Sequence, residues 1–354
     1  MNDGIGRVVQ ESLVRRRNHG GMAMQTHRHK ISRKRLAVLA LAAALVLGAG
    51  WNNRATPEVI NIAWTGEYWS TLPFRVAADK GFFERENLQA RFITFQATQL
   101  ITSALMQGDI DYGTTLAIAG AALRGLPLKI VGVVAKGTGY AIVSKREIDT
   151  LKGLKGKKFA LNSFGSAPDY AVYTFFSKNG LDPNRDVTFL TIGGTSARFA
   201  ALVGGTVDAT VVSSPFEYIA EQQGFRTLVS LKELAEYVNL PYAGVAVTQE
   251  KIAKDVGQMV KVLRALRAAM LFSREQPAAS VELLAKTLKL NRAVAERFYP
   301  VYRELYNPEL TIPDSILEEF ISVSNFRLKG TEKDKELLKI QVLRDWSFAE
   351  KAKQ

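Results

Sequence analysis

The 354-residue sequence contains no cysteine, and its only histidines, His19, His27 and His29, lie within the first 30 residues. Without cysteine there is neither a disulfide framework nor thiolate chemistry, and the redox character of the compartment stays open. If the first segment is removed, the rest of the chain also lacks histidine. This excludes imidazole acid–base catalysis and the usual zinc and copper sites. A carboxylate or lysine catalyst remains open, but we expect a protein that is not an enzyme and carries no cofactor or metal.

The sequence also lacks the short motifs of nucleotide-binding and hydrolytic enzymes: GxGxxG after a strand, a Walker sequence and a nucleophile elbow. The formal net charge of +13 is concentrated at the start. Nine of the 47 lysines and arginines and two of the 34 acidic residues lie in residues 1–50, which leaves +6 for the remainder. No dense basic run with interleaved aromatic residues follows, so nucleic acid is not an expected partner.

The first 50 residues have the pattern of an export signal. A basic stretch, residues 28–35, precedes an apolar run of small and aliphatic residues at positions 36–50. A basic segment followed by an apolar core of about 7–15 residues is typical of a signal peptide, and a bilayer span needs about 20. Cleavage after Gly50 would leave Trp51 as the first mature residue of a periplasmic protein. A retained membrane anchor is the alternative.

One segment of the chain occurs twice. Residues 98–115 and 195–213 align with an offset of 97 positions, which sets Gly108 on Gly205 and Asp111 on Asp208. Each copy has helical periodicity, a glycine stop and then a short strand, which in the first copy we expect to break at Gly113. A strand-like run precedes each helix. The repeat predicts two similar α/β lobes.

Further apolar runs alternate with helical patterns, which indicates parallel sheets covered by helices on both faces. The predicted domains are a first lobe of residues 57–144 and 243–354, and a second lobe of residues 145–242. The first lobe ends in a helical tail that we expect to pack back on it. Because the chain crosses twice between the lobes, both crossings can act as hinges.

Ligands of open parallel sheets bind outside the carboxyl ends of the strands. The loops predicted at those ends carry aromatic, amide, hydroxyl and acidic side chains. The candidate ligand-binding residues are Trp64, Tyr68, Trp69, Gln96, Thr114, Thr115, Asn162, Ser166, Thr195, Ser213, Phe216 and Glu217. Several hydroxyl and amide residues directly precede a helix, where free N–H groups and the helix dipole favour an anion.

Each of these assignments has a structural alternative. The hydroxyl and amide residues are equally readable as ordinary N-caps, worth about 1 kcal/mol each. The aromatic residues of the first loop serve either as core packing or as a platform for an apolar part of the ligand. Glu217 either binds an amine or caps a helix. Arg198 can reach an anion from the first turn of the repeat helix, although a cation there opposes the dipole.

Three motifs carry a resemblance to a known family: ADKGFF with Asn87-Leu88 at residues 78–88, ALMQGDID at 104–111 and LKGLKGKK at 151–158. They resemble the nitrate, taurine and alkanesulfonate type of ABC-importer substrate-binding proteins over roughly residues 57–250. Asn87 departs from the glycine usual in that family and affects a surface turn. The resemblance implies a type II periplasmic binding fold, with two parallel-sheet α/β lobes joined by two crossings and a helical C-terminal tail.

The resemblance also implies a function. A periplasmic, monomeric receptor would close its lobes on a small organic solute and deliver it to an ABC permease in the inner membrane. Sulfonates, nitrate-like anions, aromatic acids and thiamine-pyrimidine precursors all remain open as solutes. The related thiamine-pyrimidine synthases consume a histidine of their own, which the mature chain lacks. An enzyme on the same fold and a membrane-anchored solute sensor are the alternatives.

Overall fold

The computed structural model describes residues 56–66, 68–95, 97–115, 118–164, 166–238, 240–326 and 340–354. These residues all fall within one unit, Thr56–Gln354. The predicted export signal lies outside the described residues. Among the helices that are described, none combines the length and the apolar character needed to cross a membrane.

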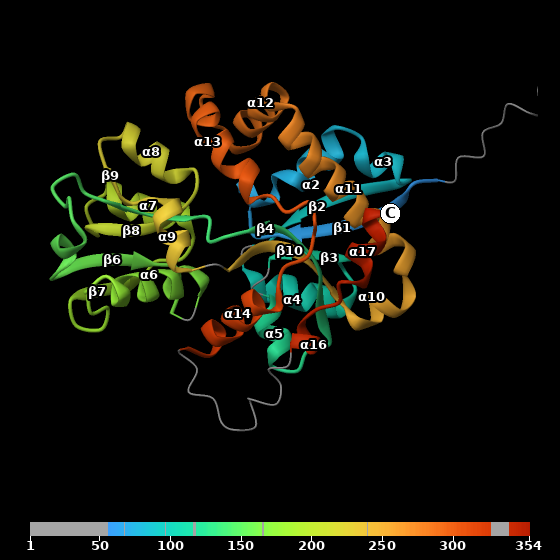
Figure 1. Ribbon diagram of the computed structural model, residues 1–354, viewed down its shortest axis with the longest axis horizontal. Helices are drawn as coiled ribbons and strands as arrows, with labels where there is room; N and C mark the ends of the chain where they lie inside the picture. The colour runs from blue at the N-terminus through green and yellow to red at the C-terminus, as the bar shows by residue number, and fades with distance from the viewer. Residues whose placement is uncertain are drawn as a thin grey trace, which may run out of the picture. The chain divides into compact units, whose positions relative to one another are not determined.

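The first of two five-stranded sheets has the strand order β2-β1-β3-β10-β4. Its strands are β1 (Glu58–Trp64), β2 (Leu88–Thr94), β3 (Tyr112–Thr115), β4 (Leu128–Lys136) and β10 (Pro241–Thr248) (Figure 1). Strand β1 runs parallel to β2 and β3, whereas β10 is antiparallel to both of its neighbours, β3 and β4. The sheet is therefore mixed, where the sequence predicted a parallel one.

The second sheet repeats this arrangement with the order β7-β6-β8-β5-β9. Its strands are β5 (Tyr140–Ser144), β6 (Lys157–Leu161), β7 (Val187–Thr191), β8 (Ala209–Ser213) and β9 (Arg226–Val229). Strand β6 is parallel to β7 and β8, and β5 is antiparallel to β8 and β9. In each sheet the antiparallel strand is therefore the fourth in order.

Strand β5 corrects the predicted boundary between the lobes. We expected the chain to leave the first lobe after Ser144, but β5 lies inside the second sheet, so the crossing precedes Tyr140. All of β5 is buried, as an interior strand requires. The Gly/Lys-rich segment after Ser144 suggested the crossing. It contains a short 3-10 turn, η3 (Leu151–Leu154), which lies between β5 and β6 of the second sheet.

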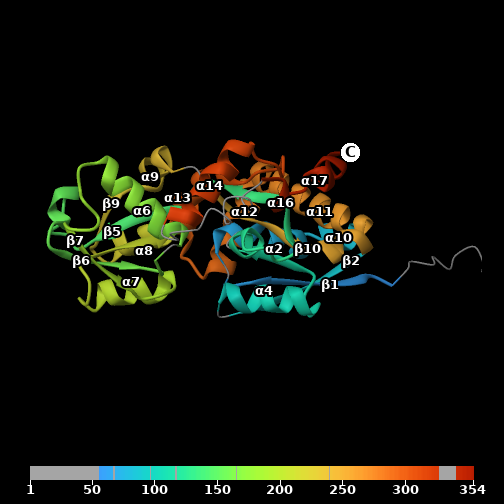
Figure 2. The same cartoon turned by 90° about the horizontal axis from the view of Figure 1, so that it is seen from below.

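Helices cover both faces of each sheet (Figures 1 and 2). The first sheet packs on one face against α4, α5 and α14, and on the other against α2, α11 and α13. The second sheet packs against α6 and α9 on one face and α7 and α8 on the other. The helices are α2 (Leu72–Asp79), α3 (Phe82–Arg85), α4 (Thr98–Gln107), α5 (Ala119–Leu123), α6 (Ala167–Lys178), α7 (Thr195–Val203), α8 (Phe216–Gln222), α9 (Leu231–Tyr237), α10 (Gln249–Lys254), α11 (Val256–Glu275), α12 (Pro277–Leu288), α13 (Arg292–Leu305), α14 (Asp314–Phe326), α16 (Ile340–Leu343) and α17 (Ser347–Lys353). A 3-10 turn, η1 (Trp69–Thr71), precedes α2.

The predicted repeat is present as α4–β3 and α7–β8. In both copies a glycine with positive φ, 78° at Gly108 and 74° at Gly205, turns the chain after the helix. The first strand differs from the prediction, because β3 runs through Gly113 instead of breaking there. A Cβ on Gly113 would lie 2.5 Å from Ile118 Cδ1, so this glycine lets the Ile118 side chain pack directly against β3.

The aspartates that align in the repeat have the same role in both sheets. Asp111 accepts the backbone N–H of Asn61 on β1 at 2.8 Å and the Lys251 ammonium at 2.8 Å. Asp208 accepts the backbone N–H of Lys158 on β6 at 3.0 Å and the Lys145 ammonium at 2.7 Å. Each carboxylate thus fixes the start of its own strand to the neighbouring parallel strand.

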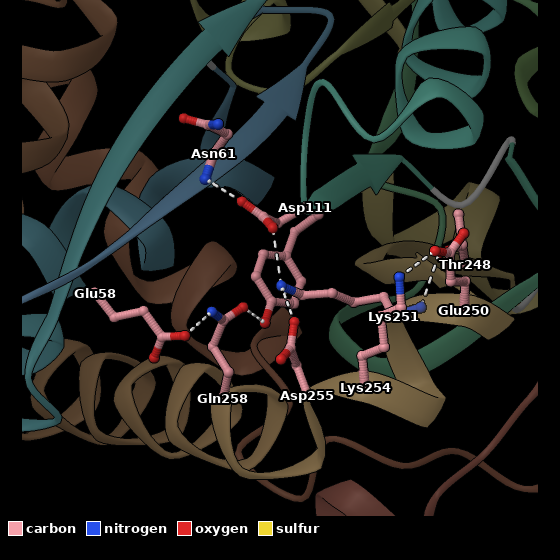
Figure 3. Close-up of polar contacts among 10 residues, drawn as sticks. Glu58, Asn61, Asp111, Thr248, Glu250, Lys251, Lys254, Asp255 and Gln258 are labelled. Atoms are coloured by element: carbon pink, nitrogen blue, oxygen red, sulfur yellow. Dashed lines mark hydrogen bonds and ion pairs between the residues drawn. The ribbon is translucent and has the colours of Figure 1, made fainter.

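The network around Asp111 also holds the tail helices to the first sheet (Figure 3). Lys251 of α10 pairs with Asp255 at 2.8 Å in addition to Asp111. The Tyr112 hydroxyl donates to Gln258 Oε1 of α11 at 2.7 Å, and Gln258 Nε2 donates to Glu58 Oε1 of β1 at 2.6 Å. These contacts hold α10 and α11 against the first sheet.

Candidate functional site

The two strands that follow the crossings each bring a tyrosine to the same place. Tyr140 opens β5, Tyr242 is the second residue of β10, and their rings meet edge to face at 5.1 Å. The Tyr242 hydroxyl donates to Ser213 Oγ at the end of β8, at 3.0 Å. Burial raises the pKa of both phenols, that of Tyr242 to about 12, so both remain protonated donors at neutral pH.

Trp69 adds an aromatic face from the first half of the chain. Its ring stacks on Tyr242 with centroids 5.0 Å apart, and its carbonyl accepts the hydroxyl of Tyr306 at 2.8 Å. The close approach depends on Gly139, where a Cβ would lie 2.5 Å from Trp69 Cζ2. The aromatic cluster of Trp69, Tyr140 and Tyr242 therefore joins elements of both sheets.

Hydroxyl groups and one arginine complete the cluster from the second sheet. The Thr195 hydroxyl donates to Ser213 Oγ at 3.2 Å and accepts from Arg198 Nη2 at 3.1 Å. Arg198 also donates through Nε to the Val211 carbonyl at 2.9 Å and through Nη1 to the Gly193 carbonyl. Its side chain is only 1% exposed, and burial lowers its pKa from the ordinary value. This buried cation holds the β7–α7 turn without a carboxylate among these partners.

Thr195 is not an N-cap. It is the first residue of α7, the N-cap is Gly194, and no side-chain cap hydrogen bond is present. Helices α4, α6 and α8 likewise begin without a side-chain cap, in contrast to α9, α10 and α13, which have one. The N-cap alternative for Thr195 is thus excluded, and its hydroxyl is used inside the cluster.

Glu217 lies beside this cluster on α8 and is 4% exposed. The Ser214 hydroxyl donates to Glu217 Oε1 at 2.6 Å, and the Ser214 backbone N–H donates to the Gly139 carbonyl at 3.0 Å. Burial raises the pKa of the Glu217 carboxyl to about 7, although the hydrogen bond from Ser214 lowers it. The carboxyl is therefore poised to change charge near neutral pH.

Two of the predicted aromatic residues lie apart from the cluster. Trp64 stacks on Phe92 at 4.7 Å, donates to Thr94 Oγ1 at 2.9 Å and lies beneath the Arg75 guanidinium. These contacts favour core packing over a ligand platform. Phe216 packs edge to face on Phe199 at 5.8 Å, on the face of the second sheet that α7 and α8 cover.

The remaining predicted residues lie in loops or at strand ends. Tyr68 donates its backbone N–H to Thr71 Oγ1 at 3.0 Å, and Thr114 is buried in β3. The Asn162 carbonyl accepts from Gly193 at 3.1 Å, and Ser166 donates its hydroxyl to the Ser163 carbonyl at 2.6 Å. Gln96 and the side chain of Thr115 lie outside the described residues.

Sequence reasoning did not select Tyr140 or Tyr242, and it noted Arg198 without including it among the candidates. Both tyrosines sit in short apolar strands, where an aromatic residue is read as packing. The usable signal was their position directly after each crossing.

A groove of about 840 Å³ lies outside this cluster, between the end of β4, the 307–313 loop and α17, and includes Lys136, Asn307 and Trp346.

Titration of Glu217 leads to a testable expectation. Its pKa is raised from 4.5 to about 7 on folding, so its contribution to stability is complete below pH 4.5 and is lost as the pH rises through 7. We expect the melting temperature to fall more steeply between pH 5 and pH 8 in the wild type than in Glu217→Gln. The Glu221→Gln variant is the control and should show the same fall in melting temperature as the wild type. An equal fall in the wild type and Glu217→Gln would contradict the raised pKa of Glu217.

The chain matches known proteins over most of its length. Residues 70–280 match the model of the family described as NMT1/THI5 like. A putative aliphatic sulfonates-binding protein of Bacillus subtilis is 25% identical over 333 residues, which cover 90% of this chain and 97% of that protein. A putative binding protein of Brucella abortus is 23% identical over 243 residues, 67% of this chain and 74% of that protein.

Solved structures share the fold. The periplasmic aliphatic sulphonate binding protein SsuA of Escherichia coli superposes with a TM-score of 0.65 and 23% identity, over 81% of this chain and 99% of that one. The periplasmic nitrate-binding protein NrtA of Synechocystis PCC 6803 gives a TM-score of 0.66 and 12% identity, over 84% and 88%.

With its two five-stranded α/β sheets, the chain has the fold of the periplasmic binding proteins on which it superposes. Within that class the chain belongs to the NMT1/THI5-like family, whose model matches more than half of its residues. The predicted resemblance and the predicted fold class are confirmed, and so is the class of function, a solute-binding protein of the ABC-importer kind. The relatives named above are binding proteins rather than enzymes.

Proposed function

We propose that this protein is an exported receptor that binds a small anionic organic solute at the cluster of Trp69, Tyr140, Thr195, Arg198 and Tyr242. The observation that carries the proposal is the buried Arg198 guanidinium, which donates to two carbonyls and one hydroxyl. A cation removed from water is costly unless a negative charge compensates it. An anionic group bound beside Thr195 and Ser213 would supply that charge.

The aromatic residues suit the rest of such a solute. Trp69 and Tyr242 offer large faces to an apolar portion, and Tyr140 and Tyr242 offer hydroxyl donors. Aliphatic sulfonates and nitrate are named for the relatives SsuA and NrtA, which supports an anion for this chain too. The export signal in residues 1–50 would place the monomeric receptor in the periplasm, where an ABC permease accepts the solute.

The proposal includes closure of two lobes. The first would hold β1–β4, β10 and the tail helices, and the second β5–β9 with its helices. Tyr242 of the first sheet donates to Ser213 of the second. Closure of the lobes would therefore bring the aromatic groups beside Tyr242 and the hydroxyl groups beside Ser213 around the solute. Small-angle scattering with and without solute measures this as a smaller radius of gyration.

A thermal-shift screen of the mature chain tests the binding activity. The panel contains ethanesulfonate, nitrate, benzoate, the neutral solute glycerol and the cation putrescine. We expect at least one anion to bind, and a ligand at 100 times its Kd stabilises the folded state by about 2.7 kcal/mol. Stabilisation by putrescine or glycerol alone would contradict an anion receptor.

A further inference from the structure

Three residues around the crossing at Gly139 each have a buried polar atom without a hydrogen-bond partner in the described part of the chain: Trp69 Nε1, Thr138 Oγ1 and Glu217 Oε2. They come from three separate elements: η1, the segment between β4 and β5, and α8. A buried polar atom without a partner costs about 1–3 kcal/mol, and native structures contain few. Three at one junction call for a functional explanation.

The contacts of Gly139 link the three residues that carry these atoms. A Cβ on Gly139 would lie 3.1 Å from Trp69 Cε2, the ring atom bonded to Nε1. Thr138 is the preceding residue and is 1% exposed. The Gly139 carbonyl accepts from Ser214, whose hydroxyl donates to the other oxygen of Glu217 at 2.6 Å. Trp69 and Thr138 therefore adjoin the glycine, and Glu217 is connected to it through Ser214.

No neighbouring charge in the described residues satisfies Glu217 Oε2. The charged groups that face this carboxyl are Glu221 on α8 and Arg297 on α13. These two pair with each other, since Arg297 Nη1 donates to Glu221 Oε2 at 2.6 Å. Glu221 Oε1 accepts the Thr227 hydroxyl at 2.7 Å. The available cation is therefore engaged elsewhere, and Glu217 retains an oxygen for another donor.

The chemistry of the three atoms defines what they can bind. The Trp69 indole only donates and the Thr138 hydroxyl donates or accepts. The ionised Glu217 carboxylate, which predominates above pH 7, only accepts. A group that satisfies all three must contain an acceptor and an N–H or O–H donor. Nitrate or an unsubstituted alkanesulfonate has acceptors alone and would leave the Glu217 oxygen without a partner.

We propose that Trp69, Thr138 and Glu217 form a specificity-determining half of the solute site, which recognises an N–H or O–H donor group of the solute. This inference rests on the proposed function, because the anionic group of the same solute would lie beside Arg198. The solute is then a bifunctional molecule, with an anionic group at one end and an amine, amide or hydroxyl at the other.

Matched pairs of probes test the proposal on the mature chain at pH 8, where the Glu217 carboxylate is mostly ionised. Isothermal titration calorimetry compares ethanesulfonate with 2-aminoethanesulfonate and 2-hydroxyethanesulfonate, and propanoate with 3-aminopropanoate. We expect a donor-bearing member to bind roughly tenfold to a hundredfold more tightly than its unsubstituted partner. The Glu217→Gln variant should lose most of that advantage for the amines. The Glu221→Gln variant, whose oxygens already have partners, should keep it.

The Thr138→Val variant gives a second readout that does not depend on the charge of Glu217. Because Thr138 Oγ1 has no partner in the described structure, its removal should leave the melting temperature of the free protein unchanged or raised. The same change should weaken binding of the donor-bearing probe. A purely structural threonine would show the opposite pattern, a lower melting temperature with unchanged affinity.

The outcomes separate this inference from the proposed function. If unsubstituted probes bind as tightly as their partners and Thr138→Val keeps full affinity, the inference is wrong and the anion receptor stands. If no member of any pair binds and the screen is also negative, both are wrong. A donor-dependent gain that Glu217→Gln and Thr138→Val reduce, but Glu221→Gln does not, supports the inference.

Discussion

Arg198→Met is expected to weaken binding of the strongest anion found in the screen by roughly tenfold to more than a hundredfold. The side chain places a positive charge at the β7–α7 turn and orients the Thr195 hydroxyl through its bond at 3.1 Å. A hydrogen bond to a charged group contributes about 1.5–3 kcal/mol, and each 1.4 kcal/mol changes Kd tenfold. Calorimetric titration measures the affinity, and the melting temperature is recorded on the same sample.

Two further variants make this result interpretable. Arg198→Lys keeps the charge but loses the planar fork that spans the two carbonyls and Thr195, so we expect an intermediate affinity. Arg264→Met removes an arginine of α11 that pairs with Glu86 and should leave affinity unchanged. If Arg198→Met lowers the melting temperature but binds the anion normally, Arg198 only supports the turn and the proposed anion site is wrong.

Asp111→Ala and Asp208→Ala are each expected to destabilise the protein by about 1.5–3 kcal/mol. Each substitution leaves a backbone N–H of the neighbouring strand and a lysine ammonium without their carboxylate. A hydrogen bond to a charged group contributes about 1.5–3 kcal/mol, and a partly exposed ion pair adds at most about 1 kcal/mol. The Asn61 bond is part-buried and the Lys158 bond is exposed, so the cost of Asp208→Ala lies at the lower end. Urea unfolding at pH 7 measures both variants, and Asp109→Ala, an exposed neighbour, is the control.

The acid limb of the stability curve gives an independent check on Asp208. Burial raises the pKa of Asp208, but the Lys145 ammonium and the Lys158 N–H outweigh it, so the net pKa is lowered below 3.8. Its contribution to stability is therefore present above the unfolded value and lost as the pH falls through the folded value. Asp208→Ala should flatten this limb. If Asp111→Ala or Asp208→Ala costs no more than Asp109→Ala, the repeated aspartate is not a structural anchor.

The sequence was informative about the fold because the residue types that recur in the repeat, glycine and aspartate, have strict geometric roles. A glycine with positive φ and an aspartate three residues further on mark the same turn in both sheets. Strand direction was not predictable in this way, since an apolar run such as 242–248 has the same pattern in either orientation. The antiparallel placement of β5 and β10 emerges only from their partners along the sheet.

The site was harder to predict, because tertiary contacts decide what an aromatic side chain of a loop packs against. Trp64 and Trp69 are five residues apart and both are fully buried, yet Trp64 stacks on Phe92 and Trp69 on Tyr242. Loop position alone does not distinguish the two. Thr195 was predicted from its place at a strand end. Arg198 became a candidate only through the structure, which shows its buried guanidinium and its three acceptors.

The interior position of β10 has a consequence for the order in which the molecule can assemble. In the first sheet β4 is joined to β3 only through β10, a strand that begins more than a hundred residues after β4 begins. The second sheet draws all its strands from the continuous stretch 140–229, so its pairings have shorter sequence separations. Because long-range pairing is slow, the half of the protein that starts later along the chain is able to complete its sheet first. The first sheet is complete only once β10 has paired with β3 and β4.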